Sequence, residues 1–476
     1  MSGRPVTENP DRRLFLVSLA LALLALALLF VLHPLDAAYQ AYLRQGDAYA
    51  EAVERAAAVV SYEQAARLHP AIPEPHLRLA HLYLEWGRLP EALDALAQAE
   101  RLGVEAPDRE RLARLWVDAY TAQADWPAVV ERSHRLLAIV PDDPAARRSL
   151  ARAYIELRAW DAAQAELESL LEIDPSDAWA HERLGALLYG YDSAAVPHLS
   201  VARTSLSESL LVVAESPGLD QDPAYASALF GQALFAAEEW ALSTRQFERA
   251  LSYSPGYADV RAYLGHALDQ MGHLDEAGPH LTRAVELAPD SVVTRVFLGL
   301  YYEQLGDYAA ARTEYEVAYD LDPENPATSV ALGRTWIADG RLDVAEFWLT
   351  NAVSLAPDDP VVWRILARFY LEYNLTSQER ATLATLRLTE LAPTDARTHD
   401  LQGWASLQAG DYEKAEASLM LALSLDPDLA SAHFHMGLLW QVRGDYERAD
   451  AAFTRALDLD TTGNLVPEVA RARVAP

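Results

Sequence analysis

The chain of 476 residues carries 70 acidic against 39 basic side chains, a formal net charge of −31. Because a surface this acidic repels the phosphate backbone, nucleic acid is excluded as an expected partner. The absence of Cys excludes disulfides, thiolate metal ligands and a catalytic thiol. Hydrophobic residues make up 51% of the chain, with 11 Trp and 22 Tyr, which is enough apolar material for a packed core.

The first predicted element is an apolar stretch at Leu14–Leu32. Its 19 uncharged residues span roughly the 30 Å of a bilayer core at about 1.5 Å per residue. The exit sequence HPLD at residues 33–36 is poor for cleavage, which favours an uncleaved signal anchor over a cleaved signal peptide. We therefore predict a transmembrane helix at residues 14–33 behind a cytoplasmic stub of residues 1–13.

The charges beside this helix predict its orientation. Arg4, Arg12 and Arg13 precede the helix, and the first basic residue after it is Arg44. Basic residues mark the cytoplasmic flank of a membrane helix, whereas acidic residues count little. We expect a single-pass protein of the cell membrane, with a cytoplasmic N-terminus and everything from about Ala37 onward outside the cytoplasm.

A repeated pattern follows, and Val292–Asn325 shows it most clearly. Apolar residues recur every three or four positions in both halves of this stretch, which predicts two amphipathic helices. Gly306 between the halves favours a tight turn, and Pro323 ends the unit. Small residues at Gly299 and Ala311 allow the two helix backbones to approach closely.

The position of Gly299 has equivalents along the chain, most of them 34 residues apart. The eleven positions are Ala80, Val117, Ala151, Gly185, Gly231, Gly265, Gly299, Gly333, Ala367, Gly403 and Gly437. This spacing of small, large and proline positions resembles the tetratricopeptide repeat (TPR), a helix-turn-helix unit of 34 residues. The resemblance implies an all-α, right-handed α-solenoid of about 11–12 units, with one array over residues 73–460 and a degenerate repeat at residues 38–70.

One stretch interrupts the regular spacing. Gly185 and Gly231 are 46 residues apart, which predicts an irregular insertion at residues 191–222. Within this insertion, Val196–Glu215 is expected to form one unusually long second helix, followed by a loop at Ser216–Pro223.

The C-terminal tail, residues 461–476, contains an early proline and offers little length for a capping helix. A repeat array needs a polar cap over its last apolar face. We therefore expect the last repeat to pack on a partner or on a second copy of the chain through Leu465, Val466 and Val469.

No motif of catalysis or cofactor binding is present, whether a P-loop, a dinucleotide-binding glycine motif, HExxH or a Ser-centred elbow. Because repeats occupy nearly all of the chain beyond the anchor, we expect a non-enzymatic protein without a cofactor. His433 and His435 are two residues apart, and His76 and His81 are five apart, unlike the pair of a helical metal site. We expect no metal site and interpret these as ordinary surface or groove histidines.

In TPR proteins the first helix of each unit lines a concave groove that binds a segment of another protein, and the resemblance implies the same here. The groove positions are the second, fifth, ninth, twelfth and thirteenth of each unit, when Gly299 and its equivalents are counted as the eighth. Two clusters of arginines and a group of aromatic residues occupy such positions: Arg111, Arg114, Arg148, Arg152, Trp179, Tyr189, Tyr225, Phe235, Arg334, Arg364, Arg368 and Arg397.

Arginine binds carboxylates through paired hydrogen bonds and stacks on aromatic rings, so these residues suit an acidic protein or peptide segment with an apolar centre. The alternative is that the arginines pair with acidic residues of neighbouring helices. The resemblance as a whole implies a membrane-anchored scaffold for protein-protein interaction or complex assembly at the cell envelope. A second hypothesis is an accessory or regulatory subunit of an envelope enzyme or of a secretion or polysaccharide system.

Overall fold

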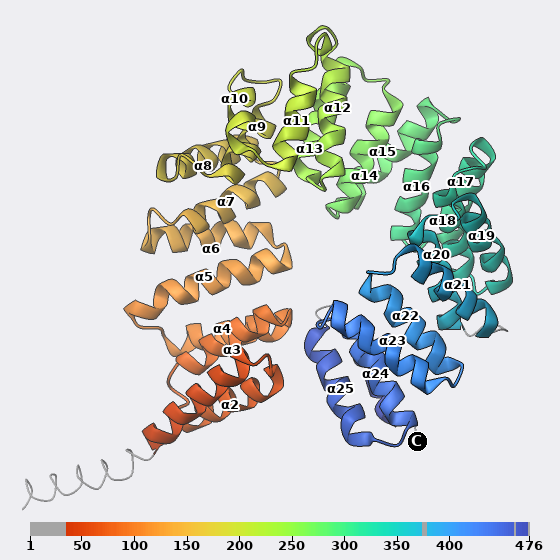
Figure 1. Ribbon diagram of the computed structural model, residues 1–476. Coiled ribbons are helices and arrows are strands. Elements are labelled where there is room, and N and C mark those ends of the chain that lie inside the picture. Colours follow the sequence, from red (N-terminus) through yellow and green to blue (C-terminus); the bar gives the residue numbers. More distant parts are fainter. Residues whose placement is uncertain (1–34, 374–377, 461–462, 475–476) are drawn as a thin grey trace, which may run out of the picture. The chain divides into compact units, whose positions relative to one another are not determined.

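The computed structural model describes residues 35–373, 378–460 and 463–474, and these residues form helices and turns without a strand. Helices that follow one another along the chain pack as antiparallel pairs (Figure 1). The predicted all-α, helical-repeat architecture is confirmed. The membrane helix predicted at residues 14–33 lies outside the described residues. Among the helices that the structure does describe, none combines the length and the apolar character needed to cross a membrane.

The chain divides into two compact units, with the boundary between Gln123 and Ala124. In the N-terminal unit, the described residues 35–51 are helical. They are followed by α2 (Arg55–Leu68), α3 (Glu74–Glu85), α4 (Leu89–Leu102) and α5 (Ala106–Gln123). The core of this unit is built from buried Leu, Ala and aromatic side chains, among them Tyr39, Leu43, Tyr62, Leu77, Leu96 and Trp116.

The C-terminal unit contains the longer run of helix pairs. Its helices are α6 (Trp126–Ile139), α7 (Pro144–Glu156), α8 (Trp160–Ile173), α9 (Ala178–Leu188), α10 (Ala195–Ala202), α11 (Ser205–Ala214), the short 3-10 helix η1 (Leu219–Gln221), α12 (Pro223–Ala236), α13 (Trp240–Tyr253), α14 (Ala258–Gln270), α15 (Leu274–Leu287), α16 (Val292–Gln304), α17 (Tyr308–Leu321), α18 (Pro326–Ala338), α19 (Leu342–Leu355), α20 (Pro360–Tyr373), α21 (Gln378–Leu391), α22 (Ala396–Gln408), α23 (Tyr412–Leu425), α24 (Ala430–Val442), α25 (Tyr446–Leu459) and α26 (Val466–Val474).

The two helices of a repeat meet where the first helix has its small residue. At Gly299 in α16, an added Cβ would overlap the ring of Tyr315 in α17, and the Tyr315 side chain is fully buried. The same approach of a large second-helix side chain to a first-helix glycine occurs at Gly46–Tyr62, Gly231–Phe247, Gly265–Leu281, Gly333–Leu349, Gly403–Leu419 and Gly437–Phe453. In these repeats one large side chain of the second helix packs directly on the backbone of the first helix, where glycine has no side chain of its own.

Local turn chemistry sets the ends of these helices. Gly306 has φ 76°, in the left-handed region that glycine adopts without strain. The next residue, Asp307, accepts a hydrogen bond from the backbone N–H of Ala310 at 3.0 Å and so caps the N-terminus of α17. Asp411 and Asp445 cap α23 and α25 in the same way.

The structure corrects the expectation of one long helix at Val196–Glu215. Arg203 adopts a left-handed conformation at φ 53° and separates α10 from α11. Thr204 then caps α11, because its hydroxyl accepts from the N–H of Ser207 while the Ser207 hydroxyl accepts from the N–H of Thr204. Leu199 of α10 packs on Gly185, so the shorter helix α10 takes the place of the second helix in this repeat.

The expectation that the tail is too short to cap the array is also wrong. Residues 466–474 form α26, whose Val469 side chain is 1% exposed and packs against Phe453 of α25. Gln441 of α24 donates to the backbone carbonyl of Ala472 at 2.7 Å and ties α26 to the preceding repeat. Val469 is therefore buried by contacts within the chain and is not available to a partner, while Val466 is exposed.

We predict that Gly299→Ala destabilises its repeat by about 1–3 kcal/mol, because the added methyl group must displace the buried ring of Tyr315. Gly256→Ala is the matched control, since no atom lies within 4 Å of its added Cβ and its backbone is not left-handed. Hydrogen exchange of the α16 and α17 amides measures the local effect in a repeat protein. Equal exchange in the two variants would contradict the packing argument.

Candidate functional site

First-helix side chains of the C-terminal unit surround a cavity of about 560 Å³. Its lining comes from α14, α16 and α18, which are the first helices of three successive repeats, and from the start of α17. The residues are His266, Asp269, Gln270, Leu300, Glu303, Gln304, Tyr308, Arg334, Ile337 and Ala338. Apart from Tyr308, all of them are the ninth, twelfth or thirteenth residue of their repeats. The structure therefore places the cavity on the positions that the resemblance assigned to the groove.

A second cavity, of about 450 Å³, lies in the N-terminal unit between α3 and α5. It is lined by His81, Leu84, Glu85, Arg111, Arg114, Leu115 and Asp118. The structure thus brings together Arg111 and Arg114, two residues of the first predicted arginine cluster. Both cavities are formed by first helices of adjacent repeats.

Four of the predicted groove arginines form ion pairs that link neighbouring first helices. Their partners are carboxylates of the chain itself, in the pairs Arg111–Glu74, Arg148–Asp177, Arg334–Glu303 and Arg364–Asp395. The Arg111 and Arg364 pairs measure 3.0 Å and 2.7 Å between nitrogen and oxygen. Asp177 and Asp395 are also the N-caps of α9 and α22. For these four arginines, the structure shows the alternative interpretation of the sequence, in which they pair with acidic residues of neighbouring helices.

The other four predicted arginines have different contacts. Arg114 pairs with Glu110 at 2.8 Å and Arg368 pairs with Glu372, each one turn away on its own helix. The Arg152 guanidinium lies 5.4 Å from the ring centroid of Trp126. Arg397 is exposed at the start of α22.

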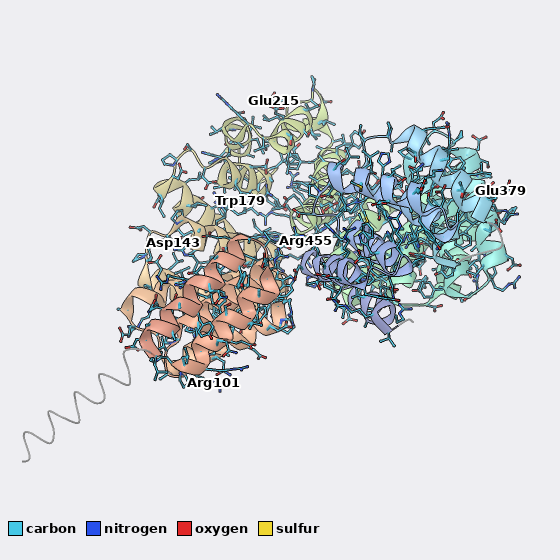
Figure 2. All side chains as sticks on the ribbon, turned by 60° about the horizontal axis from the view of Figure 1, so that its bottom comes forward. Arg101, Asp143, Trp179, Glu215, Glu379 and Arg455 are labelled. Atoms are coloured by element: carbon cyan, nitrogen blue, oxygen red, sulfur yellow. The ribbon has the colours of Figure 1, made fainter. Side chains whose placement is uncertain are left out.

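Three of the four predicted groove aromatics pack against the chain itself. Trp179, labelled in Figure 2, has the guanidinium groups of Arg148 and Arg183 at 5.5 Å and 5.4 Å from its ring. Tyr189 stacks on Phe230 with ring centroids 3.8 Å apart. Phe235 lies in a cluster with Trp240, Tyr263 and Phe297, whereas Tyr225 is 45% exposed.

The most unusual electrostatic environment in the larger cavity belongs to three residues that the sequence analysis did not single out. Burial lowers the pKa of His266 to about 4, and its ring stacks on Phe297 with centroids 4.6 Å apart. Burial raises the pKa values of Asp269 and Glu303 above their ordinary range. The same groove rule that selected Arg334 includes these positions, so a search for every charged groove residue, rather than for arginine, would have found them.

Glu303 connects the cavity to the core of its repeat. Its carboxylate pairs with Arg334 of α18, and its side chain is only 8% exposed. The phenol of Tyr315, which packs on Gly299, lies beside this carboxylate, and burial together with the negative charge raises the pKa of Tyr315. Glu303 therefore links the lining of the cavity to the packing of Tyr315 on Gly299, the contact that holds the two helices of this repeat together.

One histidine departs from the expectation of ordinary surface or groove residues. His435 of α24 is 6% exposed, and its Nδ1 lies 2.7 Å from a carboxylate oxygen of Asp400 in α22. Its ring also stacks on Trp404. His435 is thus a buried polar link between two first helices.

Comparison with known families agrees with the helix-pair geometry. A tetratricopeptide repeat family model matches residues 120–187, 234–296 and 302–369, and a second tetratricopeptide repeat model matches residues 396–429. These segments of the chain are therefore tetratricopeptide repeats, a class of repeat typical of protein-protein interaction scaffolds. No curated protein matches the chain significantly.

Several solved structures also match the chain. A chain from the crystal structure of the APC/C hetero-tetramer Cut9-Hcn1 is 15% identical, with 92% of this chain and 90% of that chain covered and a TM-score of 0.39. A tetratricopeptide repeat protein from Parabacteroides merdae is 14% identical, with coverages of 53% and 99% and a TM-score of 0.42. YrrB, described as having an unusual peptide-binding site, is 21% identical, with coverages of 39% and 95% and a TM-score of 0.33.

We predict that Arg148→Ala destabilises the chain more than Arg364→Ala. Arg148 neutralises Asp177, whose side chain is 4% exposed, whereas Asp395, the partner of Arg364, is 32% exposed. A carboxylate left buried without its cation costs about 1–3 kcal/mol, and an exposed ion pair contributes about 1 kcal/mol or less. Hydrogen exchange at the starts of α9 and α22 compares the two losses. Equal losses at the two sites would show that burial of the aspartate does not set the cost.

We also predict that acid destabilises the cavity through His266. Because its folded pKa of about 4 lies below the ordinary 6.5, neutral His266 contributes stability above pH 6.5 that is lost as the pH falls toward 4. The shift corresponds to about 3 kcal/mol at 1.36 kcal/mol per unit. The charged groups that share the cavity with His266 are Asp269 of its own helix, Glu303 and Arg334.

The measurement is hydrogen exchange of the α14 amides between pH 7 and pH 4.5, corrected for intrinsic exchange. His266→Phe keeps a ring to stack on Phe297 and removes the titration, so its protection should fall less with acid than that of the parent chain. The same acid-dependent loss in both proteins would assign the effect to other groups.

Proposed function

We propose that this chain is a membrane-anchored, non-enzymatic scaffold that holds a segment of another protein against the first helices of its repeats. The observation that carries the proposal is the cavity between α14, α16 and α18. Its walls are groove positions of three successive repeats, and exposed Gln270, Gln304 and Ala338 lie at its rim. A surface that repeats with the period of the helices can follow an extended partner over several repeats.

The anchoring part of the proposal comes from the sequence. Leu14–Leu32 has the length and apolar character of a membrane helix, and the three arginines before it favour a cytoplasmic N-terminus. We propose that the repeats lie outside the cytoplasm, at the cell envelope. Partners would then be other envelope proteins, either as members of an assembly or as an enzyme that the repeats accompany.

The chemistry of the partner is constrained by the ion pairs. An acidic segment would bind Arg111, Arg148, Arg334 or Arg364 only by competing with the carboxylates of Glu74, Asp177, Glu303 and Asp395, which already accept from them. Such competition exchanges one carboxylate for another and yields little net free energy. Binding through shape, apolar contact and unpaired polar groups of the cavity is therefore favoured over binding through the arginines.

The test is co-purification of full-length chain from membranes in mild detergent, compared with a variant whose groove rim is filled. Gln304→Trp with Ala338→Trp places bulky rings at two exposed rim positions, so we expect a stoichiometric partner to be lost while the fold persists. Thr313→Trp with Ser354→Trp is the matched control, because both positions are exposed on second helices. If the partner is an enzyme in constant ratio, the chain is an accessory subunit.

Protease added to intact spheroplasts should remove the repeats in the same preparation. Protection until lysis would place the repeats in the cytoplasm and contradict the envelope location. Retention of the partner by the rim-filled variant would contradict the groove as the binding surface.

A further inference from the structure

The cavity between α14, α16 and α18 contains a buried carboxylate that the chain does not satisfy. The Asp269 side chain is 3% exposed, and its Oδ1 has no hydrogen-bond partner. Its Oδ2 is 3.4 Å from the side-chain nitrogen of Gln270, a long contact from a residue that is itself exposed. A carboxylate buried with so little donation is costly, so Asp269 is an acceptor short of donors among the residues that line the cavity.

A buried imidazole lies beside this carboxylate. Nδ1 of His266 is also without a hydrogen-bond partner and is 3.7 Å from Oδ2 of Asp269. The pKa of His266, lowered by burial to about 4, keeps the imidazole neutral at pH 7, so that one ring nitrogen can accept a hydrogen bond. Asp269 and His266 are one turn apart on α14, so that a carboxylate and a neutral imidazole, which has one accepting nitrogen, lie side by side in the lining of the cavity.

The net charge of the lining is negative. Asp269 and Glu303 contribute two carboxylates, and Arg334 is the one cation among the lining residues. Arg334 is held by Glu303, which leaves Asp269 without a counter-charge. The rest of the lining includes Leu300 and Ile337.

We propose that this cavity, which in the proposed function is part of the protein-binding groove, receives an arginine or lysine side chain of the bound protein segment. The cationic head donates to Asp269 and to the neutral ring of His266, and the aliphatic stem lies along Leu300 and Ile337. A guanidinium offers five donors and an ammonium three, which matches a wall of acceptors. A cavity of about 560 Å³ that includes Leu300 and Ile337 in its lining is far larger than a bare cation requires and suits a long side chain.

The experiment uses full-length chain in lipid nanodiscs and four pools of nine-residue peptides. All pools are random except at the central residue, which is arginine, lysine, norleucine or glutamate, and retention of each pool is quantified by mass spectrometry. The arginine and lysine pools should be retained about tenfold better than the norleucine pool, which has a similar stem without the charge. The ratio of the arginine to the lysine pool tells which head the site prefers.

Two pairs of variants test whether the preference for arginine or lysine peptides arises at this cavity. Asp269→Asn should abolish it, whereas Asp320→Asn, at an exposed position of the second helix α17, removes the same charge and should leave it intact. Ala338→Arg places a tethered guanidinium on the rim and should compete with the peptide, while Ala338→Met adds a side chain of similar length without charge and should not. The Ala338 pair keeps the test decisive if Asp269→Asn disturbs the fold, because Ala338 is exposed.

The outcomes separate this inference from the function on which it rests. Pools that bind without preference for arginine or lysine, or a preference that survives both Asp269→Asn and Ala338→Arg, would overturn the cationic pocket and leave peptide binding in place. Failure of the parent chain to retain any pool would overturn peptide binding itself.

Discussion

The structure depends on the close approach of two helices at one position in each repeat. Where α16 has Gly299, the ring of Tyr315 fills the space that a side chain would occupy, and Gly333 with Leu349 repeats the arrangement one unit later. This contact fixes the rotation of the first helix about its axis, because the eighth position must face the second helix. The ninth, twelfth and thirteenth positions then face the neighbouring first helices, where the cavity lies. The packing of the core therefore determines which residues are offered to a partner.

Much of this architecture could be predicted from the sequence because it is periodic. Small residues that are mostly 34 positions apart and a proline after most helix pairs give the helices and their order without any long-range information. Where the sequence departs from the 34-residue period, local hydrogen bonds and packing contacts determine where the helices begin and end. The break between α10 and α11 falls at Arg203, in a stretch (residues 198–215) without glycine or proline, and is fixed by the cap that Thr204 and Ser207 form. The final helix α26 has nine residues, too few to be stable alone, and is held by the contact of Val469 with the last repeat.

The repeat positions that line the cavity could be counted out from the sequence, but which of their charged groups are paired could not. Counting from the small residue identified Arg334, and the same count identifies Asp269 and Glu303, but a sequence does not say which charge will be neutralised. Glu303 pairs with Arg334 of the next repeat through one carboxylate oxygen, and Asp269 has no such cationic partner. Other links connect more distant segments, as where Arg158, before α8, pairs with Glu248 of α13 and Glu276 of α15. Such contacts depend on how successive repeats turn around the insertion, which no single repeat encodes.

The charge of the whole chain and the chemistry of the cavity lead to the same class of partner. Because arginines such as Arg148 and Arg364 are paired with the chain's own carboxylates, they add little to the field that an approaching protein experiences. The formal charge of −31 then dominates at long range and accelerates the encounter with basic segments. At short range, Asp269 discriminates among those segments, since only one that carries a cation at the right spacing supplies the missing donors. Attraction by net charge and selection by one buried carboxylate are thus separate steps, and the second depends on the packing that holds α14 beside α16 and α18.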